Sequence, residues 1–224
     1  MRREYAEQEM EHRVSRQVAL LVITLASFLA PFMISSINIA LPAIGQEFAL
    51  DAVLLSWVAT SYLLAAAMFL LPFGRLADIV GRRRLFLYGA CIYTLSSLLA
   101  GRASSVVALF LFRVAQGIGG AMISGAGVAI LTSVLPIGER GRVLGINVAS
   151  VYIGLSLGPF LGGLLTGQWG WRSIFFLNVP LGLAVIALVL WKLRGEWAEA
   201  QGERFDLMGA VIFSAGLVAL MYGV

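Results

Sequence analysis

The chain has 224 residues, of which 60% are hydrophobic and only 12% are charged, and its mean hydropathy is +0.91. An ordinary soluble domain carries roughly 25% charged residues, so this composition excludes that class and predicts an all-α polytopic membrane protein. Long unbroken apolar runs exclude a membrane barrel, whose strands alternate apolar and polar residues. The net charge of +4 comes from basic residues at the ends of apolar runs, so we expect no nucleic-acid partner.

In chain order, residues 1–16 form a mixed-charge leader that we expect to be cytoplasmic and amphipathic. The first span lies within Gln17–Gln46. The second and third are Ala52–Phe73 and Leu85–Gly101, each close to the roughly 20 residues that a helix needs to cross a bilayer core. Between them lies Gly74–Arg84, which we interpret as a short polar loop and which holds four of the chain's sixteen basic residues.

The fourth span lies between Arg102 and Glu139, the fifth within Val143–Trp171, and the sixth is Ser173–Trp191. Residues 17–191 are therefore expected to form a six-helix transmembrane bundle.

Beyond the bundle we expect a charged cytoplasmic linker over residues 192–206 and the start of a seventh span over residues 207–224. Because the last apolar run has no polar flank after it, we interpret the chain as truncated or partial.

The basic residues predict the orientation of the spans. Thirteen of the sixteen lie on one side of the alternating spans, Arg102 and Arg172 lie on the other, and Arg113 lies inside a span. Basic residues concentrate on the cytoplasmic side of membrane proteins, so the amino terminus and the loops after the second, fourth and sixth spans should be cytoplasmic. The expected location is the plasma membrane, as the inner membrane of a bacterium or archaeon.

Metal, cofactor and catalytic chemistry find no support in the sequence. The only histidine, His12, lies in the leader, and the only cysteine, Cys91, lies inside a span. This excludes a histidine-based metal centre and an intrachain disulfide. No HExxH motif or pair of intramembrane carboxylates is present, so we expect no enzyme and no cofactor.

Arg113 is the most unusual residue of the predicted spans. A guanidinium at membrane depth costs from roughly 3 to more than 10 kcal/mol, so it normally faces a polar cavity or a partner. Gln116 follows three residues later on the same helix face. We therefore assign both residues to a polar pathway. The alternative is an arginine that extends outward from a misplaced span boundary.

The fifth span is dense in glycine. Three glycines recur at every fourth residue, which predicts a smooth ridge that another helix can approach closely. A proline in the same span removes a backbone hydrogen bond and bends the helix. Packing alone could also explain the glycines. The residues concerned are Gly145, Gly154, Gly158, Pro159, Gly162 and Gly163.

The segment Gly74–Arg84 has its own internal pattern. Asp78 and Arg82 are four residues apart and would meet on a helical turn. Gly74 and Gly81 are expected to bracket a tight reversal. The alternative is a solvated loop whose charges only set the topology.

Five segments resemble, in the same order along the chain, signatures of the major facilitator superfamily. Gly74–Arg84 resembles the signature between its second and third helices, and Arg113–Gly117 resembles its fourth-helix motif. The fifth-span residues match the antiporter motif at each fixed position. Asn38–Pro42 and Phe176–Gly182 resemble the first and sixth helices of the fourteen-span drug:proton antiporter branch.

The resemblance implies the amino-terminal half of a transporter with twelve or fourteen spans in two halves. Such a protein binds a small-molecule substrate between the halves and works by alternating access. It implies efflux of drug-like or other small amphiphilic compounds by antiport with protons, with a missing carboxy-terminal half or a second copy as partner. The implied pathway residues are Asn38, Arg113 and Gln116. The implied gating-loop residues are Gly74, Asp78, Gly81, Arg82 and Arg83.

Two departures from the branch leave alternatives open. Members usually carry a carboxylate at the position of Met33, and a base at the position of Ile79. No acidic residue lies inside a predicted span, and Arg113 cannot exchange a proton near neutral pH. The alternatives are a partial or decayed half-transporter without independent activity, and an uncoupled transporter of another small solute.

Overall fold

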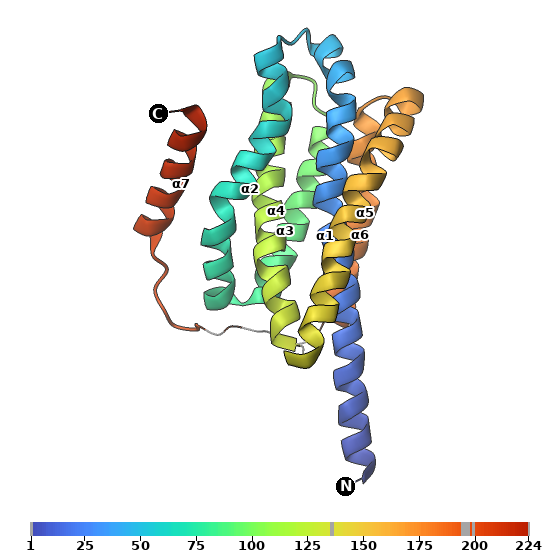
Figure 1. Cartoon of the computed structure of the whole chain (residues 1–224), viewed down its shortest axis with the longest axis vertical. Helices are drawn as coiled ribbons and strands as arrows, with labels where there is room; N and C mark the ends of the chain where they lie inside the picture. Colours follow the sequence, from blue (N-terminus) through green and yellow to red (C-terminus); the bar gives the residue numbers. More distant parts are fainter. Residues whose placement is uncertain (1, 135–136, 194–197, 199, 224) are drawn as a thin grey trace.

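The structure, a computed structural model, describes residues 2–134, 137–193, 198 and 200–223. Within these residues it consists of α-helices and contains no strand, which confirms the all-α fold. Figure 1 shows α1 to α6 in one bundle with α7 beside α2. The helices are α1 (Arg2–Phe48), α2 (Ala52–Val80), α3 (Arg82–Ala100), α4 (Val106–Val134), α5 (Ile137–Trp169), α6 (Arg172–Lys192) and α7 (Leu207–Tyr222).

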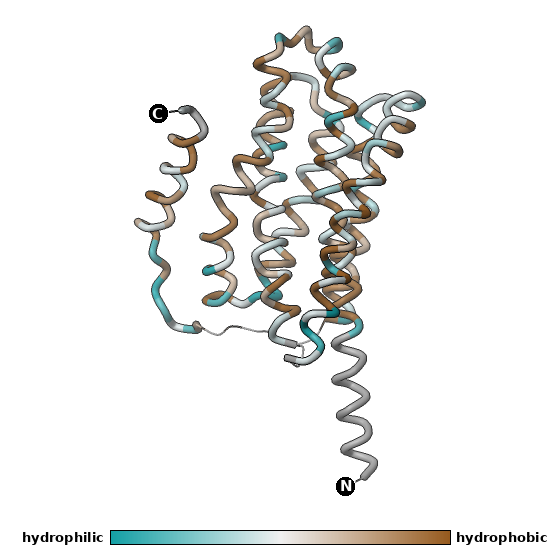
Figure 2. Tube along the Cα trace, viewed as in Figure 1, coloured by the Kyte–Doolittle hydropathy of each residue, from teal (hydrophilic) through white to brown (hydrophobic). Residues whose placement is uncertain are grey.

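Five of these helices are long and apolar enough to span a membrane, namely α1 from Gln17 onward, α2, α4, α5 and α6. Helix α3 has 19 residues and begins with three arginines, and α7 contains a shorter apolar stretch over Leu207–Leu220. Figure 2 shows the helix bodies as largely hydrophobic or neutral and the segment that leads into α7 as hydrophilic. A six-helix bundle followed by the start of a further apolar helix is thus confirmed.

Helices α1 and α4 form the middle of the bundle. Helix α1 packs along α5 and against α6, whereas α4 packs along α2 and α3. Small residues on α4 allow close approach: a Cβ added at Gly117 would lie 2.4 Å from the carbonyl oxygen of Tyr62, and one added at Gly119 would lie 2.7 Å from the backbone nitrogen of Tyr93. Small residues at helix contacts are typical of membrane bundles.

Buried apolar side chains form two clusters. One includes Phe86 and extends from the middle of the bundle to the end that carries Gly81. The other includes Trp171 and lies at the opposite end, near Glu47. We refer to these as the Gly81 end and the Glu47 end.

The segment Gly74–Arg84 is mostly helical, because α2 and α3 leave only Gly81 between them. Gly81 has φ +118°, a conformation that favours glycine, and it makes the reversal. Gly74 lies inside α2 and faces α4, where a Cβ on Gly125 would lie 3.2 Å from the Gly74 nitrogen. The expected turn glycine is therefore right at Gly81 and wrong at Gly74, which lies inside α2 and where an added Cβ would meet nothing within 4 Å.

For the leader the structure describes only the backbone, whereas for part of the linker it also describes side-chain contacts. From Arg2 onward the leader forms the first turns of α1, which continues without a break into the span. The side chains of residues 1–16 lie outside the described residues, so the amphipathic character of the leader stays a prediction. In the linker, the Ala200 backbone N–H donates to the Asp78 carbonyl oxygen at 3.0 Å, and Arg75 pairs with Glu203.

Candidate functional site: a cavity in the bundle

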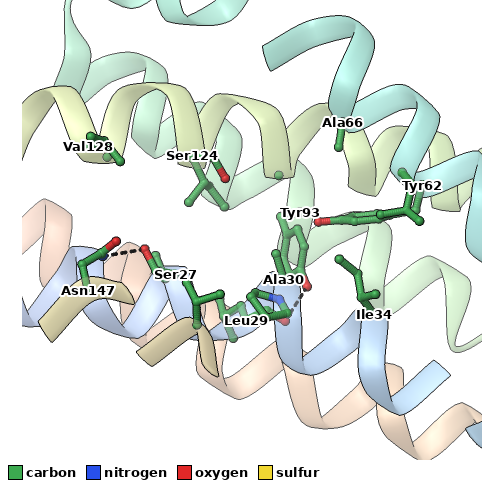
Figure 3. Close-up of a pocket in the computed structure, with 17 residues that line it drawn as sticks. Ser27, Leu29, Ala30, Ile34, Tyr62, Ala66, Tyr93, Ser124, Val128 and Asn147 are labelled. Carbon is green, nitrogen blue, oxygen red and sulfur yellow. Dashed lines mark hydrogen bonds between the residues drawn. The ribbon is translucent and has the colours of Figure 1, made fainter. Parts of the chain in front are cut away.

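A cavity of about 380 Å³ lies between α1, α2, α4 and α5. Its wall is mostly apolar, with a few polar side chains that belong to Ser27, Tyr62, Tyr93, Ser124 and Asn147. In Figure 3, Ser124 projects from α4 on one side and Asn147 lies near Ser27 on the other. The Asn147 amide donates to Ser27 Oγ at 2.8 Å, and the Tyr93 hydroxyl donates to the Leu29 carbonyl at 3.1 Å. Mostly apolar walls with a few fixed polar groups are typical of small-molecule sites.

Arg113 lies behind Tyr62, one of the residues that line this cavity. Its side chain is fully buried, and its guanidinium carbon lies 4.5 Å from the centroid of the Tyr62 ring. Arg113 Nε donates to the Val58 carbonyl at 2.9 Å, and Nη1 donates to Gln116 Oε1 at 2.7 Å. Gln116 Nε2 donates in turn to Ser97 Oγ at 2.7 Å. Arg113 Nη2 is buried and has no hydrogen-bond partner in the part of the chain that is described.

The structure places Arg113 and Gln116, which we assigned to a polar pathway, inside the bundle and behind the cavity wall, and that assignment stays a prediction. Both are 0% exposed, and a backbone carbonyl and an amide oxygen inside the bundle accept hydrogen bonds from two of the three guanidinium nitrogens. Asn38, also expected in the pathway, is exposed on α1 and does not line the cavity. It lies one helical turn beyond Ile34, which does line it.

The glycine ridge of α5 packs on α1. A Cβ added at Gly158 would lie 2.5 Å from the Ser35 Cβ, and one added at Gly162 would lie 2.8 Å from the Ser36 Cα. Gly154 makes an equally close approach to the α1 backbone. The close contact expected from the ridge is present, and the helix that makes it belongs to the same half.

The remaining residues of the antiporter motif behave differently. An added Cβ would meet nothing within 4 Å at Gly145, and only the Ile39 side chain, at 3.7 Å, at Gly163. Pro159 lies inside α5 and has no N–H to bond the carbonyl of Leu155, four residues earlier. Ser35 Oγ of α1 donates to that carbonyl at 2.8 Å. The Leu155 carbonyl, which the proline leaves without a partner in its own helix, is thus hydrogen-bonded by a side chain of α1.

A cluster at the Gly81 end, which we call the Gly81 clasp, comprises Asp78, Arg82 and Arg83. Arg82 Nη2 lies 2.7 Å from Asp78 Oδ1, so the two side chains meet on a helical turn as the spacing predicts. Arg82 Nη1 donates to the Ala129 carbonyl of α4 at 3.3 Å. Arg83 Nε donates to the Leu193 carbonyl at 2.6 Å, just past the end of α6, where unpaired carbonyls favour a cation. The clasp therefore ties α2, α3, α4 and α6 together.

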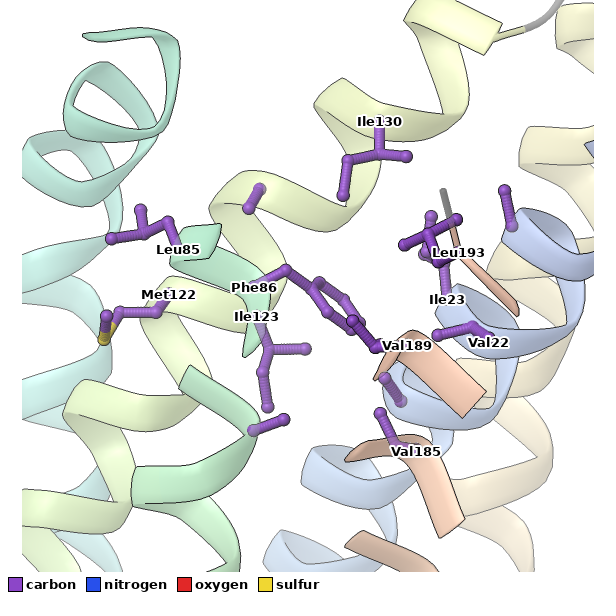
Figure 4. Packing of buried hydrophobic residues seen from close by; sticks show 14 of the residues in the cluster. Val22, Ile23, Leu85, Phe86, Met122, Ile123, Ile130, Val185, Val189 and Leu193 are labelled. Atoms are coloured by element: carbon purple, nitrogen blue, oxygen red, sulfur yellow. The ribbon is translucent and has the colours of Figure 1, made fainter. Parts of the chain in front are cut away.

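The clasp lies over tightly packed apolar side chains. Figure 4 shows Phe86 of α3 between residues of α4 and residues of α1 and α6, including Ile130 and Val189. All three are fully buried. The clasp thus lies at one end of a buried apolar cluster.

The Glu47 end carries a second polar cluster, which sequence reasoning missed. Arg172 contacts both Glu47 carboxylate oxygens, at 2.7 Å and 2.6 Å, and Trp171 Nε1 donates to Glu47 at 2.8 Å. Arg172 also donates to the Ala103 carbonyl at 3.0 Å. These contacts join the end of α1 to the start of α6 and the turn before α4. The available signal was the presence of only two acids and two bases, Glu47, Asp51, Arg102 and Arg172, on the sparsely charged side of the topology.

Sequence reasoning also missed the polar residues of the cavity wall, Tyr62, Tyr93, Ser124 and Asn147. Their signal was polarity inside an apolar run, but polarity alone does not show which helix face turns inward. Among the residues that the structure describes, no group of three or more His, Cys, Asp or Glu could hold a metal ion.

Comparison with known proteins gives several relatives. The chain is 42% identical over 189 residues to multidrug resistance protein Stp of Mycobacterium tuberculosis, covering 84% of this chain and 35% of that protein. It is 41% identical over 208 residues to the cephamycin export protein CmcT of Amycolatopsis lactamdurans, covering 92% of this chain and 43% of that protein. The chain thus spans less than half the length of these relatives.

Among solved structures, the crystal structure of peptide transporter POT in complex with sulfate superposes with a TM-score of 0.73 at 18% identity. The match covers 91% of this chain and 46% of that chain, and it establishes the fold alone. Residues 23–222 match the family profile of the Major Facilitator Superfamily, which extends over most of the chain. The chain therefore belongs to the major facilitator superfamily of membrane transporters.

Proposed function

We propose that this chain is the amino-terminal half of an exporter of small amphiphilic compounds that works by alternating access in the plasma membrane, with its amino terminus in the cytoplasm. The observation that carries the proposal is the cavity between α1, α2, α4 and α5, whose apolar wall holds a few fixed polar groups. Such a wall suits a compound with an apolar body and a small polar part. The names of two relatives, a multidrug resistance protein and an antibiotic export protein, support the direction of transport.

In this proposal the Gly81 clasp is part of the cytoplasmic gate. It joins four helices of the half, so it moves as one body with them when the two halves rock. Asp78 is held by Arg82 and, through its backbone carbonyl, by Ala200 of the linker. A carboxylate placed this firmly offers a fixed docking point for a second half.

Proton coupling, in this proposal, uses a group outside this chain. The cavity wall contains no carboxylate or histidine, and Arg113 keeps its proton near neutral pH. Antiport needs a group that gains and loses a proton in the pathway. The second half would supply it, either as a further part of a longer protein or as a separate chain.

The test is export of an uncharged dye by the complete transporter that carries this chain. Energised cells of an efflux-deficient host, preloaded with Nile red, should lose the dye faster than cells with an empty vector, and a protonophore should abolish the difference. A Tyr62→Ala variant, which alters the cavity wall, should export more slowly at equal membrane abundance. Dye loss no faster than with the empty vector would refute the proposed function.

A further inference from the structure

We infer that the cavity of this half accepts anionic or uncharged amphiphiles and rejects cations. This inference rests on the proposed function, because it concerns the same cavity, and it adds the charge of the substrate. It rests on three observations: a buried positive charge beside the wall, the absence of a negative charge from the wall, and hydrogen-bond donors within it.

The positive charge is the guanidinium of Arg113. It is fully buried, and no carboxylate lies within ion-pair distance of it among the described residues. Two of its nitrogens donate to uncharged oxygens, and Nη2 has no hydrogen-bond partner among the described residues. A buried charge that lacks an opposite charge is strongly unfavourable, so it favours a negative group placed near it.

Tyr62 brings this charge to the cavity. The guanidinium carbon lies 4.5 Å from the centroid of a ring that forms part of the cavity wall. A charged group bound on the cavity side of the ring would lie roughly 8 Å from the guanidinium, which is within the Debye length of about 10 Å at 0.1 M salt. A cation bound against Tyr62 would be repelled, whereas an anion at the same place would be attracted.

Among its described residues, the cavity wall carries no negative side chain that could offset the positive charge of Arg113. The residues that line the cavity, all within the described chain, include no Asp, Glu, Lys or Arg. Of the described acids at the ends of the spans, Glu47 and Asp78 lie at opposite ends of the bundle and are held by arginines. Asp51 and Glu139 are exposed and do not line the cavity. Hydroxyl groups of Ser27 and Ser124 can donate hydrogen bonds to an anionic or neutral oxygen. A quaternary ammonium has no atom that can accept them.

The experiment uses this chain, residues 1–224, in nanodiscs of phosphatidylcholine, a lipid without net charge. Three tritiated probes share one naphthalene body: naphthalene-2-carboxylate, 2-naphthyltrimethylammonium and the uncharged 2-methoxynaphthalene. Equilibrium dialysis measures binding, and nanodiscs without protein give the lipid background. We expect the carboxylate to bind at least about tenfold more tightly than the ammonium, a difference of about 1.4 kcal/mol.

Two arginine variants test the source of the preference. Arg113→Gln should bring the affinities of the carboxylate and the ammonium within about twofold of each other. Arg102→Gln removes the same charge from an exposed turn and should change nothing. Thermal unfolding and size-exclusion profiles establish that each variant is folded. A preference that persists in folded Arg113→Gln would overturn the role given to Arg113.

A second pair of variants covers the case in which Arg113→Gln does not fold. Ser124 is an exposed position of the wall, and Ser124→Asp adds a carboxylate to the cavity where Ser124→Asn adds a neutral group of similar size. The aspartate should shift the preference at least about tenfold toward the ammonium, and the asparagine should not. An unchanged ratio in Ser124→Asp would show that the probes bind elsewhere and would overturn the inference.

The outcomes separate this inference from the function on which it rests. If the uncharged probe binds and the ammonium binds as tightly as the carboxylate, the charge preference is wrong and the proposed function stands. If no probe binds above the lipid background, the cavity is not a binding site and both proposals fail.

Discussion

Gly158 is the position at which the packing of α5 on α1 can be tested most directly. Even an alanine Cβ would lie 2.5 Å from the Ser35 Cβ and 3.1 Å from the Phe32 carbonyl oxygen, whereas ordinary contact begins near 3.4 Å. The two helices must therefore separate by roughly 1 Å, and overpacking of this kind costs about 1–3 kcal/mol.

The separation also stretches two hydrogen bonds between the helices. Ser35 Oγ donates to the Leu155 carbonyl at 2.8 Å, and Ser36 Oγ donates to the Gly158 carbonyl at 3.0 Å. Side-chain hydrogen bonds between membrane helices contribute about 0.6–2 kcal/mol each. We therefore expect Gly158→Ala to lower the free energy of unfolding by about 2–4 kcal/mol.

The assay is equilibrium unfolding in mixed micelles with increasing sodium dodecyl sulfate, followed by far-ultraviolet circular dichroism. Gly167→Ala is the matched control, because it lies on the same helix and its added Cβ meets nothing within 4 Å. It should leave stability unchanged or raise it by up to about 1 kcal/mol through helix propensity. In the complete transporter, Gly158→Val should also abolish transport or make the membrane leaky. Equal stability of Gly158→Ala and Gly167→Ala would refute the packing of the ridge on α1.

Three further predictions concern the two ends of the bundle. In a Cys91→Ser background, an impermeant thiol reagent added outside cells should label Ala49→Cys but not Ile79→Cys, and the reverse pattern would overturn the orientation. Asp78→Asn should impair transport by the complete transporter at unchanged membrane abundance, and an unchanged rate would return the segment to a role in topology alone. Glu47→Gln should lower the free energy of unfolding by about 1 kcal/mol, because the partly exposed ion pair at that end is lost. Thermal unfolding that matches the unsubstituted chain would show that this cluster contributes nothing.

Much of the fold could be predicted from the sequence because apolar runs of span length, separated by charged segments, can form few structures other than a helix bundle. The spacing of Asp78 and Arg82 and the ridge in α5 follow from helix periodicity in the same way. The turn expected at Gly74 was wrong, because periodicity does not show where one helix ends and the next begins. The helices that surround Gly74 and Arg113 could not be known from the sequence alone.

The cavity itself could not be predicted, because its wall combines residues of α1, α2, α4 and α5 with Tyr93 of α3. Tyr62 comes from α2, Ser124 from α4 and Asn147 from α5. Each is one polar residue in an apolar run, and many such residues only satisfy a neighbouring backbone group. Thr94 and Ser96 of α3, for example, donate to carbonyls of their own helix. Only the placement of the helices separates the two roles.

The prolines give a last prediction, which links the sequence to the contact between α1 and α5. Pro159 leaves the Leu155 carbonyl without a hydrogen bond from its own helix, and Ser35 Oγ donates to this carbonyl at 2.8 Å instead. Ser35→Ala should therefore cost about 1–2 kcal/mol when Pro159 is present, since a carbonyl is left unpaired in an apolar region. In a Pro159→Ala background the restored N–H of residue 159 can bond the Leu155 carbonyl. Removal of the Ser35 hydroxyl should then cost less than about 0.5 kcal/mol, which is the limit within which independent substitutions are additive. A double-mutant cycle in mixed micelles measures the difference. Additive effects of the two substitutions would show that Ser35 does not compensate for the proline, and that the close approach of α1 to the glycine ridge rests on packing alone.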